Sequence, residues 1–386
     1  MNSPTNSRSL HSSTQPSSDA QPLLVPGTTG RQRSSALDVL RTALTALVIV
    51  HHTAITFGAD GSWFFRDPAA SFSLPLTVLT AVDQSFFMGL FFGVAGHFSG
   101  SSLARKGPLQ FLSDRGLRLG VPALFFGWVL YPLIVWLQTA HTHQPFAWPP
   151  LHDFNPGPLW FTLALLLFCV ALVVVRQLRP AGEPSTAPLR FSQAIRLALA
   201  MAVLTVATRL VFPLGVNVLW FQMGYFPQYI LLFCVGVASS GTDFLARVPR
   251  TWLLPALLAG ATAISGGLAV FLLGAGGNAE LMRGGMHWQA ATYAVLECVQ
   301  CLAFCIVALL LARKHVGRSR LGSELSRNAF GAYVLHAPIL VALGMWASSL
   351  PLAQEWKFVF TAVLAILASF IAGGAFRRLP LAREIF

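Results

Sequence analysis

Charged residues are scarce in this chain of 386 residues. Asp, Glu, Lys and Arg together make up only 10% of it, whereas 55% is hydrophobic, and the mean hydropathy is +0.63. An ordinary soluble domain carries about 25% charged residues. Apolar runs long enough to cross a bilayer recur from Ala36 to the end. The composition therefore excludes a sizeable soluble domain and predicts an all-α, polytopic membrane helix bundle.

An apolar run is missing only from the first 35 residues, which are rich in Ser, Thr, Pro and Gln. Such a segment lacks the apolar core of a signal peptide, and its composition is typical of disorder. We expect a disordered cytoplasmic tail over residues 1–35 and one transmembrane domain over residues 36–386.

Cysteine is sparse as well, and the odd number of five does not indicate a disulfide framework. Cys298 and Cys301 have the CxxC spacing, but a zinc or redox site needs further ligands and a solvent-facing loop. We interpret these thiols as apolar packing groups and expect neither a metal ion nor a bound cofactor.

The apolar runs predict about ten transmembrane helices. They lie near residues 37–57, 74–99, 119–138, 158–175, 196–212, 226–240, 252–274, 290–312, 328–348 and 357–376. An even number of spans places both termini on the same side of the membrane.

The distribution of basic residues orients this bundle. With ten spans, 22 of the 26 Lys and Arg fall on the side of the amino-terminal tail. The positive-inside rule then predicts a cell (inner) membrane protein with both termini in the cytoplasm. The net charge of +12 does not indicate nucleic-acid binding, because the basic residues punctuate the spans. An aromatic belt is expected at the opposite interface, formed by Trp63, Trp148, Trp220, Trp288 and Trp356.

Ionisable residues inside the spans are candidates for function, because burying them in a bilayer is expensive. They are Arg41, His51, His52, Asp83, His97, Arg209, Glu297 and His336. Arg41 and His52 are eleven residues apart and return to within roughly 20° of the same helical face, whereas His51 lies about 80° away. This stripe predicts a cation at the cytoplasmic mouth and a titratable base about 16 Å deeper. The alternative is that Arg41 reaches the lipid headgroups while both imidazoles pair with neighbouring helices.

Other polar residues and a glycine series allow further interpretations. Arg115 and Arg118 share one helical face at a cytoplasmic helix entrance, which suits a phosphorylated ligand and equally suits membrane anchoring. Glu297 needs a partner, so it either orients a catalytic histidine or closes a structural ion pair. Four glycines four or three residues apart predict close helix packing; they are Gly89, Gly93, Gly96 and Gly100.

Four stretches resemble the acyltransferase-3 family of integral membrane O-acyltransferases, most closely its glucans-biosynthesis-protein-C-like branch. They are DVLRTALTALVIVHH, VDQSFFMGLFFGVAGHF with SLARKGPLQFLSDRGLRLGVP, GPLWFTLALLLF, and NAFGAYVLHAPILVAL. The family's R-x10-H signature falls on Arg41 and His52, and its R-x-x-R signature on Arg115 and Arg118. Its Leu-Trp-Phe and Tyr-x-x-His motifs correspond to Leu159, Trp160, Phe161, Tyr333 and His336.

The resemblance implies transfer of an acyl group, such as acetyl or succinyl, from cytoplasmic acyl-CoA to a hydroxyl of a carbohydrate or related acceptor. Under this hypothesis Arg41, Arg115 and Arg118 bind the donor phosphates, and His52 acts as a general base or forms an acyl-histidine. Glu297 is expected to orient His52. Four residues are expected to contact the acceptor or the acyl group, and they are Trp160, Arg209, Tyr333 and His336. A transporter or flippase of a polar or glycosylated substrate is the rival hypothesis, because polar residues also mark translocation paths.

Overall fold

A computed structural model describes residues 26–150, 152–179, 182, 186–314 and 320–380. Most of the predicted tail, residues 1–25, lies outside the described residues. Residues 26–35 form the beginning of the first helix, α1 (Pro26–Thr56), so this helix starts ten residues before the predicted membrane domain.

The described residues are almost entirely helical. The further α-helices are α2 (Leu74–Lys106), α3 (Pro108–Arg115), α4 (Val121–Phe125), α5 (Tyr131–His141), α6 (Trp160–Leu178), α7 (Phe191–Val211), α8 (Phe226–Ala238), α9 (Phe244–Arg247), α10 (Leu253–Ala269), α11 (Glu280–Arg283), α12 (Trp288–Lys314), α13 (Arg320–Ser348) and α14 (Gln354–Phe376). Short helical turns are η1 (Gly116–Gly120), η2 (Phe126–Leu130), η3 (Gly157–Leu159), η4 (Met223–Tyr225), η5 (Arg250–Trp252) and η6 (Val270–Gly274). One two-residue hairpin pairs β1 (Asn217–Val218) with β2 (Phe221–Gln222).

The predicted helix bundle is confirmed. Nine helices of the described chain are long and apolar enough to span a membrane. A shorter apolar helix, Met223–Ala238, corresponds to the predicted span near 226–240. The largest boundary difference is in the third span, which runs from Pro108 to His141 rather than over 119–138.

Two wide helical turns interrupt this third span, and prolines explain both. The turns η1 and η2 are π-helical, and each is followed within two residues by a proline, Pro122 or Pro132. A proline has no N–H for the carbonyl four residues earlier, so the backbone rearranges there. The turn η1 carries Arg118, and the irregularity therefore lies in the segment that presents this guanidinium.

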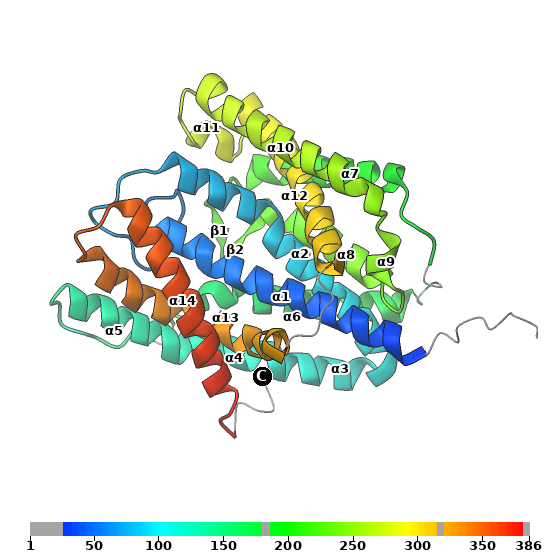
Figure 1. The fold of residues 1–386 in the computed structure, drawn as a ribbon, viewed down its shortest axis with the longest axis horizontal. Helices are drawn as coiled ribbons and strands as arrows, with labels where there is room; N and C mark the ends of the chain where they lie inside the picture. The colour runs from blue at the N-terminus through cyan, green and yellow to red at the C-terminus, as the bar shows by residue number, and fades with distance from the viewer. Residues whose placement is uncertain (1–25, 151, 180–181, 183–185, 315–319, 381–386) are drawn as a thin grey trace, which may run out of the picture.

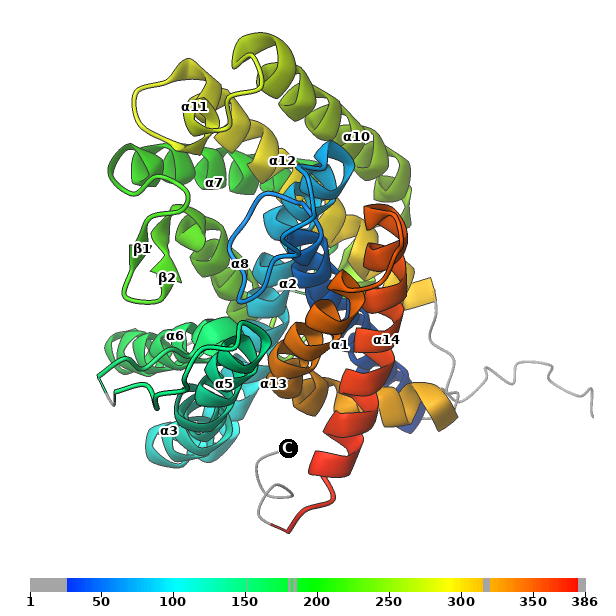
Figure 2. The same ribbon diagram turned by 90° about the vertical axis from the view of Figure 1, so that its left-hand side faces the viewer.

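The two ends of the bundle lie at the right and the left of Figure 1. The segments α3 and α9 lie at the right, and the connections near α5 and α11 lie at the left. In the end view of Figure 2, α1 and α2 lie near the centre, with α7, α10 and α12 on one side and α5 and α6 on another. We call the end that holds α3, α9 and the beginning of α1 the basic end.

Close contact between α2 and α8 confirms the packing predicted from the glycine series. A Cβ atom on Gly96 would lie 2.3 Å from the carbonyl oxygen of Phe233, and one on Gly236 would lie 2.0 Å from that of Gly93. Only glycine allows two helix backbones to approach so closely. The contact fixes the position of α2, which lines the site described next.

Candidate active site

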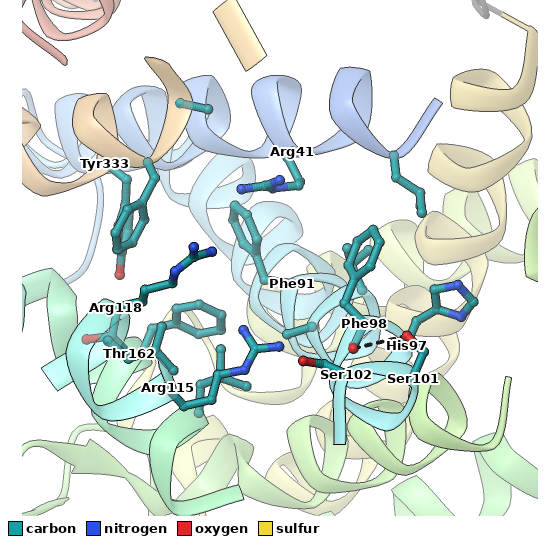
Figure 3. A pocket seen from close by; sticks show the side chains of 18 of the residues that line it. Arg41, Phe91, His97, Phe98, Ser101, Ser102, Arg115, Arg118, Thr162 and Tyr333 are labelled. Carbon is teal, nitrogen blue, oxygen red and sulfur yellow. Dashed lines mark hydrogen bonds between the residues drawn. The ribbon is translucent and has the colours of Figure 1, made fainter. Parts of the chain in front are cut away.

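A cavity of about 810 Å³ lies at the basic end, among α1, α2, the α3–η1 segment, α6 and α13. Five cationic side chains line it, and they are Arg41, Arg105, Lys106, Arg115 and Arg118. Figure 3 shows Arg41 entering from one side and Arg115 and Arg118 from the opposite side, with Phe91 between them. The predicted donor-binding residues therefore share one cavity, although they come from segments far apart in the sequence.

Few carboxylates balance this charge. Asp114 pairs with Lys106, and Asp38 lies 3.9 Å from Arg41 at the exposed end of α1. The guanidinium of Arg115 lies over the ring of Phe111, 5.3 Å from its centroid. Cations on opposite walls that outnumber the neighbouring carboxylates attract an anionic ligand, and guanidinium groups bind phosphate oxygens in bidentate fashion.

Tyr333 on α13 lines the cavity and links it to the histidines. Its hydroxyl donates a hydrogen bond to the carbonyl oxygen of Pro158, and its ring lies 5.8 Å from the ring of His336. Thr45 also lines the cavity, and His52 lies two helical turns further along α1, roughly 10 Å away. His52 and His336 are not among the described residues that line the cavity, whereas Tyr333 lines it and contacts the ring of His336.

His52 and His336 form a pair between α1 and α13. The Nε2 atom of His336 lies 3.3 Å from Nδ1 of His52, and Nδ1 of His336 lies 2.6 Å from the carbonyl oxygen of Tyr333. A carbonyl only accepts, so Nδ1 of His336 carries a proton. In the neutral ring Nε2 then accepts from Nδ1 of His52. This arrangement leaves Nε2 of His52 as the basic nitrogen.

Trp63 covers the histidine pair from the other end of the bundle. Its ring stacks on His52 with centroids 3.8 Å apart and an interplanar angle of 17°, and it lies 5.8 Å from His336. The sequence predicted Trp63 in an interfacial belt. The structure instead directs it inward from the connection between α1 and α2, which could not be read from hydropathy.

An ion pair and hydrogen bonds hold this connection in place. The ammonium of Lys357 donates to Oδ2 of Asp67 and to the carbonyl oxygen of Ser348, both at 3.0 Å, and both charged side chains are buried. The backbone N–H of Ser71 donates to Oε1 of Gln354 at 3.0 Å. These bonds tie the segment that carries Trp63 to the beginning of α14.

Glu297 and Arg209 lie in a different cluster from His52. Nη2 of Arg209 donates to both carboxylate oxygens of Glu297, at 2.8 and 3.0 Å, and Gln228 donates to the same carboxylate at 2.6 Å. Of the two roles open to Glu297, the geometry supports the structural ion pair and gives no support to orienting His52. Arg209 was expected to bind an acidic acyl group, but its guanidinium is already paired with Glu297.

Trp160 belongs to an aromatic group beside that cluster. Its ring stacks on Tyr229 at 5.9 Å and meets Phe161 edge-on at 6.5 Å. Phe161 lines the cavity, whereas Trp160 is not among its described lining residues. The structure thus brings four predicted residues together at one cavity: Arg41, Arg115, Arg118 and Tyr333. His52 and His336 pair with each other next to it. Trp160 does not line the cavity among the described residues.

Sequence reasoning did not single out Trp63, Arg105 or Lys106 as site residues. The two cations lie in the last turn of the glycine-rich helix α2, and their position at the end predicted to be cytoplasmic was the available indication. Trp63 lies in a connection whose path depends on contacts with α14, almost 300 residues further along the chain.

The fold and the site define a class: a multi-pass membrane protein with a cation-lined cavity beside a buried histidine pair. Residues 34–377 match the family model described as "Acyltransferase domain". The chain belongs to the acyltransferase-3 family, as its motifs predicted. Comparisons with curated proteins and with solved structures gave no match.

Proposed function

We propose that the protein is an O-acyltransferase of the cell (inner) membrane, with both termini and the basic end in the cytoplasm. It moves an acetyl, succinyl or similar group from acyl-CoA to a hydroxyl of a carbohydrate or related acceptor, with glucan among the candidates. The observation that carries this proposal is the cavity with five cations, which is lined by Tyr333, a neighbour of His336 in the His52–His336 pair.

The cavity suits the donor in charge and size. Coenzyme A carries a diphosphate and a ribose phosphate, and Arg41, Arg115 and Arg118 enter the cavity from two sides to meet such groups. A volume of about 810 Å³ lies within the usual range of small-molecule sites. The pantetheine arm then extends along the α1 stripe toward Thr45 and His52.

Tyr333 lines the donor cavity and contacts the ring of His336, and the proposed reaction requires its side chain to swing aside. The thioester then reaches Nε2 of His52, which takes the proton of the acceptor hydroxyl as that oxygen attacks the carbonyl carbon. The C–S bond breaks and coenzyme A leaves as a thiolate that picks up a proton. His336 keeps Nδ1 of His52 protonated, and the stacked Trp63 stabilises the imidazolium. An acyl-histidine intermediate uses the same nitrogen.

The first test replaces His52 with Ala. Membranes containing the variant are incubated with acetyl-CoA or succinyl-CoA and a glucan extract, and release of free coenzyme A is measured. Loss of the base lowers the rate by at least about 100-fold, and His336→Asn lowers it less because the base remains.

Thr361→Val is the matched control, because this buried hydroxyl on α14 has no hydrogen-bond partner among the described residues. Equal membrane content of the three variants is verified by immunoblot. Undiminished release of coenzyme A by the His52→Ala protein would remove His52 from the mechanism.

A further inference from the structure

A second titratable pair lies directly behind His52. His51 on α1 and Asp83 on α2 face each other, with Nδ1 of His51 and Oδ2 of Asp83 separated by 3.9 Å. The ring of His51 meets that of His52 edge-on, with centroids 5.3 Å apart and an angle of 85°. Asp83, His51, His52 and His336 thus form one continuous row across three helices.

The two facing atoms are buried and have no hydrogen-bond partner among the described residues. His51 is 8% exposed and Asp83 is 3% exposed. A buried carboxylate without a donor is unfavourable by several kcal/mol, so proteins rarely keep one without a use. A separation of 3.9 Å is about 1 Å longer than a hydrogen bond, and a small shift of either side chain closes it.

The Asp83 carboxylate can compensate a positive charge that forms on His52 during the reaction. Attack of the acceptor hydroxyl moves a proton to Nε2 of His52 and leaves an imidazolium in a region of low dielectric. There a negative charge on the far side of His51 lowers the free energy of the imidazolium. His51 lies next to both groups, with its Nδ1 3.9 Å from Oδ2 of Asp83 and its ring centroid 5.3 Å from that of His52.

We propose that Asp83 is the counter-charge of His52 and acts through His51. In the state with protonated His52 the carboxylate is ionised, and the Nδ1–H of His51 closes on Oδ2 of Asp83. Asp83 and His51 are therefore positioning residues, and their role rests on the proposed function of His52.

The remaining ionisable groups on the surrounding helices are engaged elsewhere. Glu297 on α12 is paired with Arg209, and Lys357 on α14 with Asp67. The phenol of Tyr229 on α8 accepts a hydrogen bond from Gln84. On α13, His336 faces His52. Asp83 is thus the carboxylate that faces the histidine row from the described helices.

The decisive variant is Asp83→Asn, which keeps the shape and the hydrogen-bonding capacity of the side chain and removes its charge. The full-length protein in membranes is assayed with acetyl-CoA or succinyl-CoA over a range of pH. Without the anion the protonated form of His52 is less favourable. The acid limb of the kcat profile moves to lower pH by about one unit, and kcat at neutral pH falls about tenfold.

KM for the donor stays within about twofold, because the cations that bind it are untouched. If the His51–Asp83 pair were purely structural, Asp83→Asn could change the free energy of unfolding but would leave the acid limb of the kcat profile at the same pH. That result would overturn the proposal. His51→Asn and the double variant complete a cycle. If Asp83 acts through His51, the double variant is no slower than the slower single variant. Additive losses would contradict the connection.

A second readout needs no acceptor. Diethyl pyrocarbonate modifies unprotonated imidazole, and peptide mass spectrometry resolves the modification of His52 as a function of pH. Modification of His52 in Asp83→Asn extends to lower pH than in the wild type, with Thr361→Val as the unchanged control. If His52→Ala stays active, the proposed function fails. If only the Asp83→Asn profiles are unchanged, this inference fails alone.

Discussion

Arg209 and Glu297 are the most deeply buried ion pair of the described chain, each 2% exposed. The guanidinium also donates through Nε to the carbonyl oxygen of Gly224 at 3.2 Å and lies 5.2 Å from the ring centroid of Tyr225. The pair joins α7 to α12, so its contribution at the residue scale is to connect helices. Removal of one partner leaves the other charge uncompensated.

Arg209→Met is expected to lower the free energy of unfolding by about 3 to 5 kcal/mol. The measurement is thermal unfolding of the detergent-solubilised protein, with Ser369→Ala as the control because its buried hydroxyl has no partner among the described residues. The Arg209→Met/Glu297→Met double variant recovers part of the loss. Equal midpoints for Arg209→Met and the wild type would show that the pair does not hold these helices together.

Residue-scale prediction is simplest where a property depends on one helix. The eleven-residue spacing predicted that Arg41 and His52 share one stripe, and the cavity is lined by Arg41 and Thr45 of this stripe and does not extend to His52. Residue-scale prediction failed where the partner comes from a distant segment. Glu297 meets Arg209, 88 residues away, and His52 meets His336, 284 residues away. The sequence showed that each needs a partner and did not reveal which one.

At the scale of elements, the crossing of α2 and α8 fixes the position of α2, which forms one wall of the cation-lined cavity. Gly236 packs against the backbone of Gly93, where a side chain cannot move aside because the opposing atom is a main-chain oxygen. Gly120 is a matched counterpart, since a Cβ there meets nothing within 4 Å and its φ of −72° is helical.

Gly236→Ala is expected to destabilise the protein by about 1 to 3 kcal/mol, because the helices must separate. Gly120→Ala is expected to leave the free energy of unfolding unchanged or to raise it by up to about 1 kcal/mol. Thermal unfolding in detergent compares the two. A Gly236→Ala protein as stable as the Gly120→Ala protein would contradict the close crossing.

Hydropathy predicted ten spans, of which nine are candidate spans in the described chain and the tenth corresponds to the shorter helix Met223–Ala238, because length and apolarity are local properties. It missed features that arise from the backbone or from contacts. The third span starts eleven residues earlier than predicted, since the amphipathic segment that contains Arg115 and Arg118 is helical too. The connection that carries Trp63 folds inward because Lys357 and Gln354 of α14 hold it.

At the scale of the whole molecule, the two ends of the bundle differ in the residues that they carry. Its cations gather at the basic end, where the cavity opens among α1, α2 and α3, whereas Trp63 covers the histidines from the opposite end. This asymmetry fits a donor that arrives from one side of the membrane and an acceptor that arrives from the other. Such a pathway makes the cavity the donor entrance, which is the central claim of this account.

Binding of coenzyme A to the purified protein in detergent tests that claim most directly, with calorimetry as the measurement. Arg115→Ala/Arg118→Ala is predicted to raise Kd at least tenfold, because each charge-assisted bond contributes about 1.5 to 3 kcal/mol. The control Arg196→Ala/Arg250→Ala removes the same charge from residues that are exposed and are not among the cavity's described lining residues, and it leaves Kd within about twofold. Equal affinity of both double variants and the wild type would contradict the assignment of this cavity to the acyl donor.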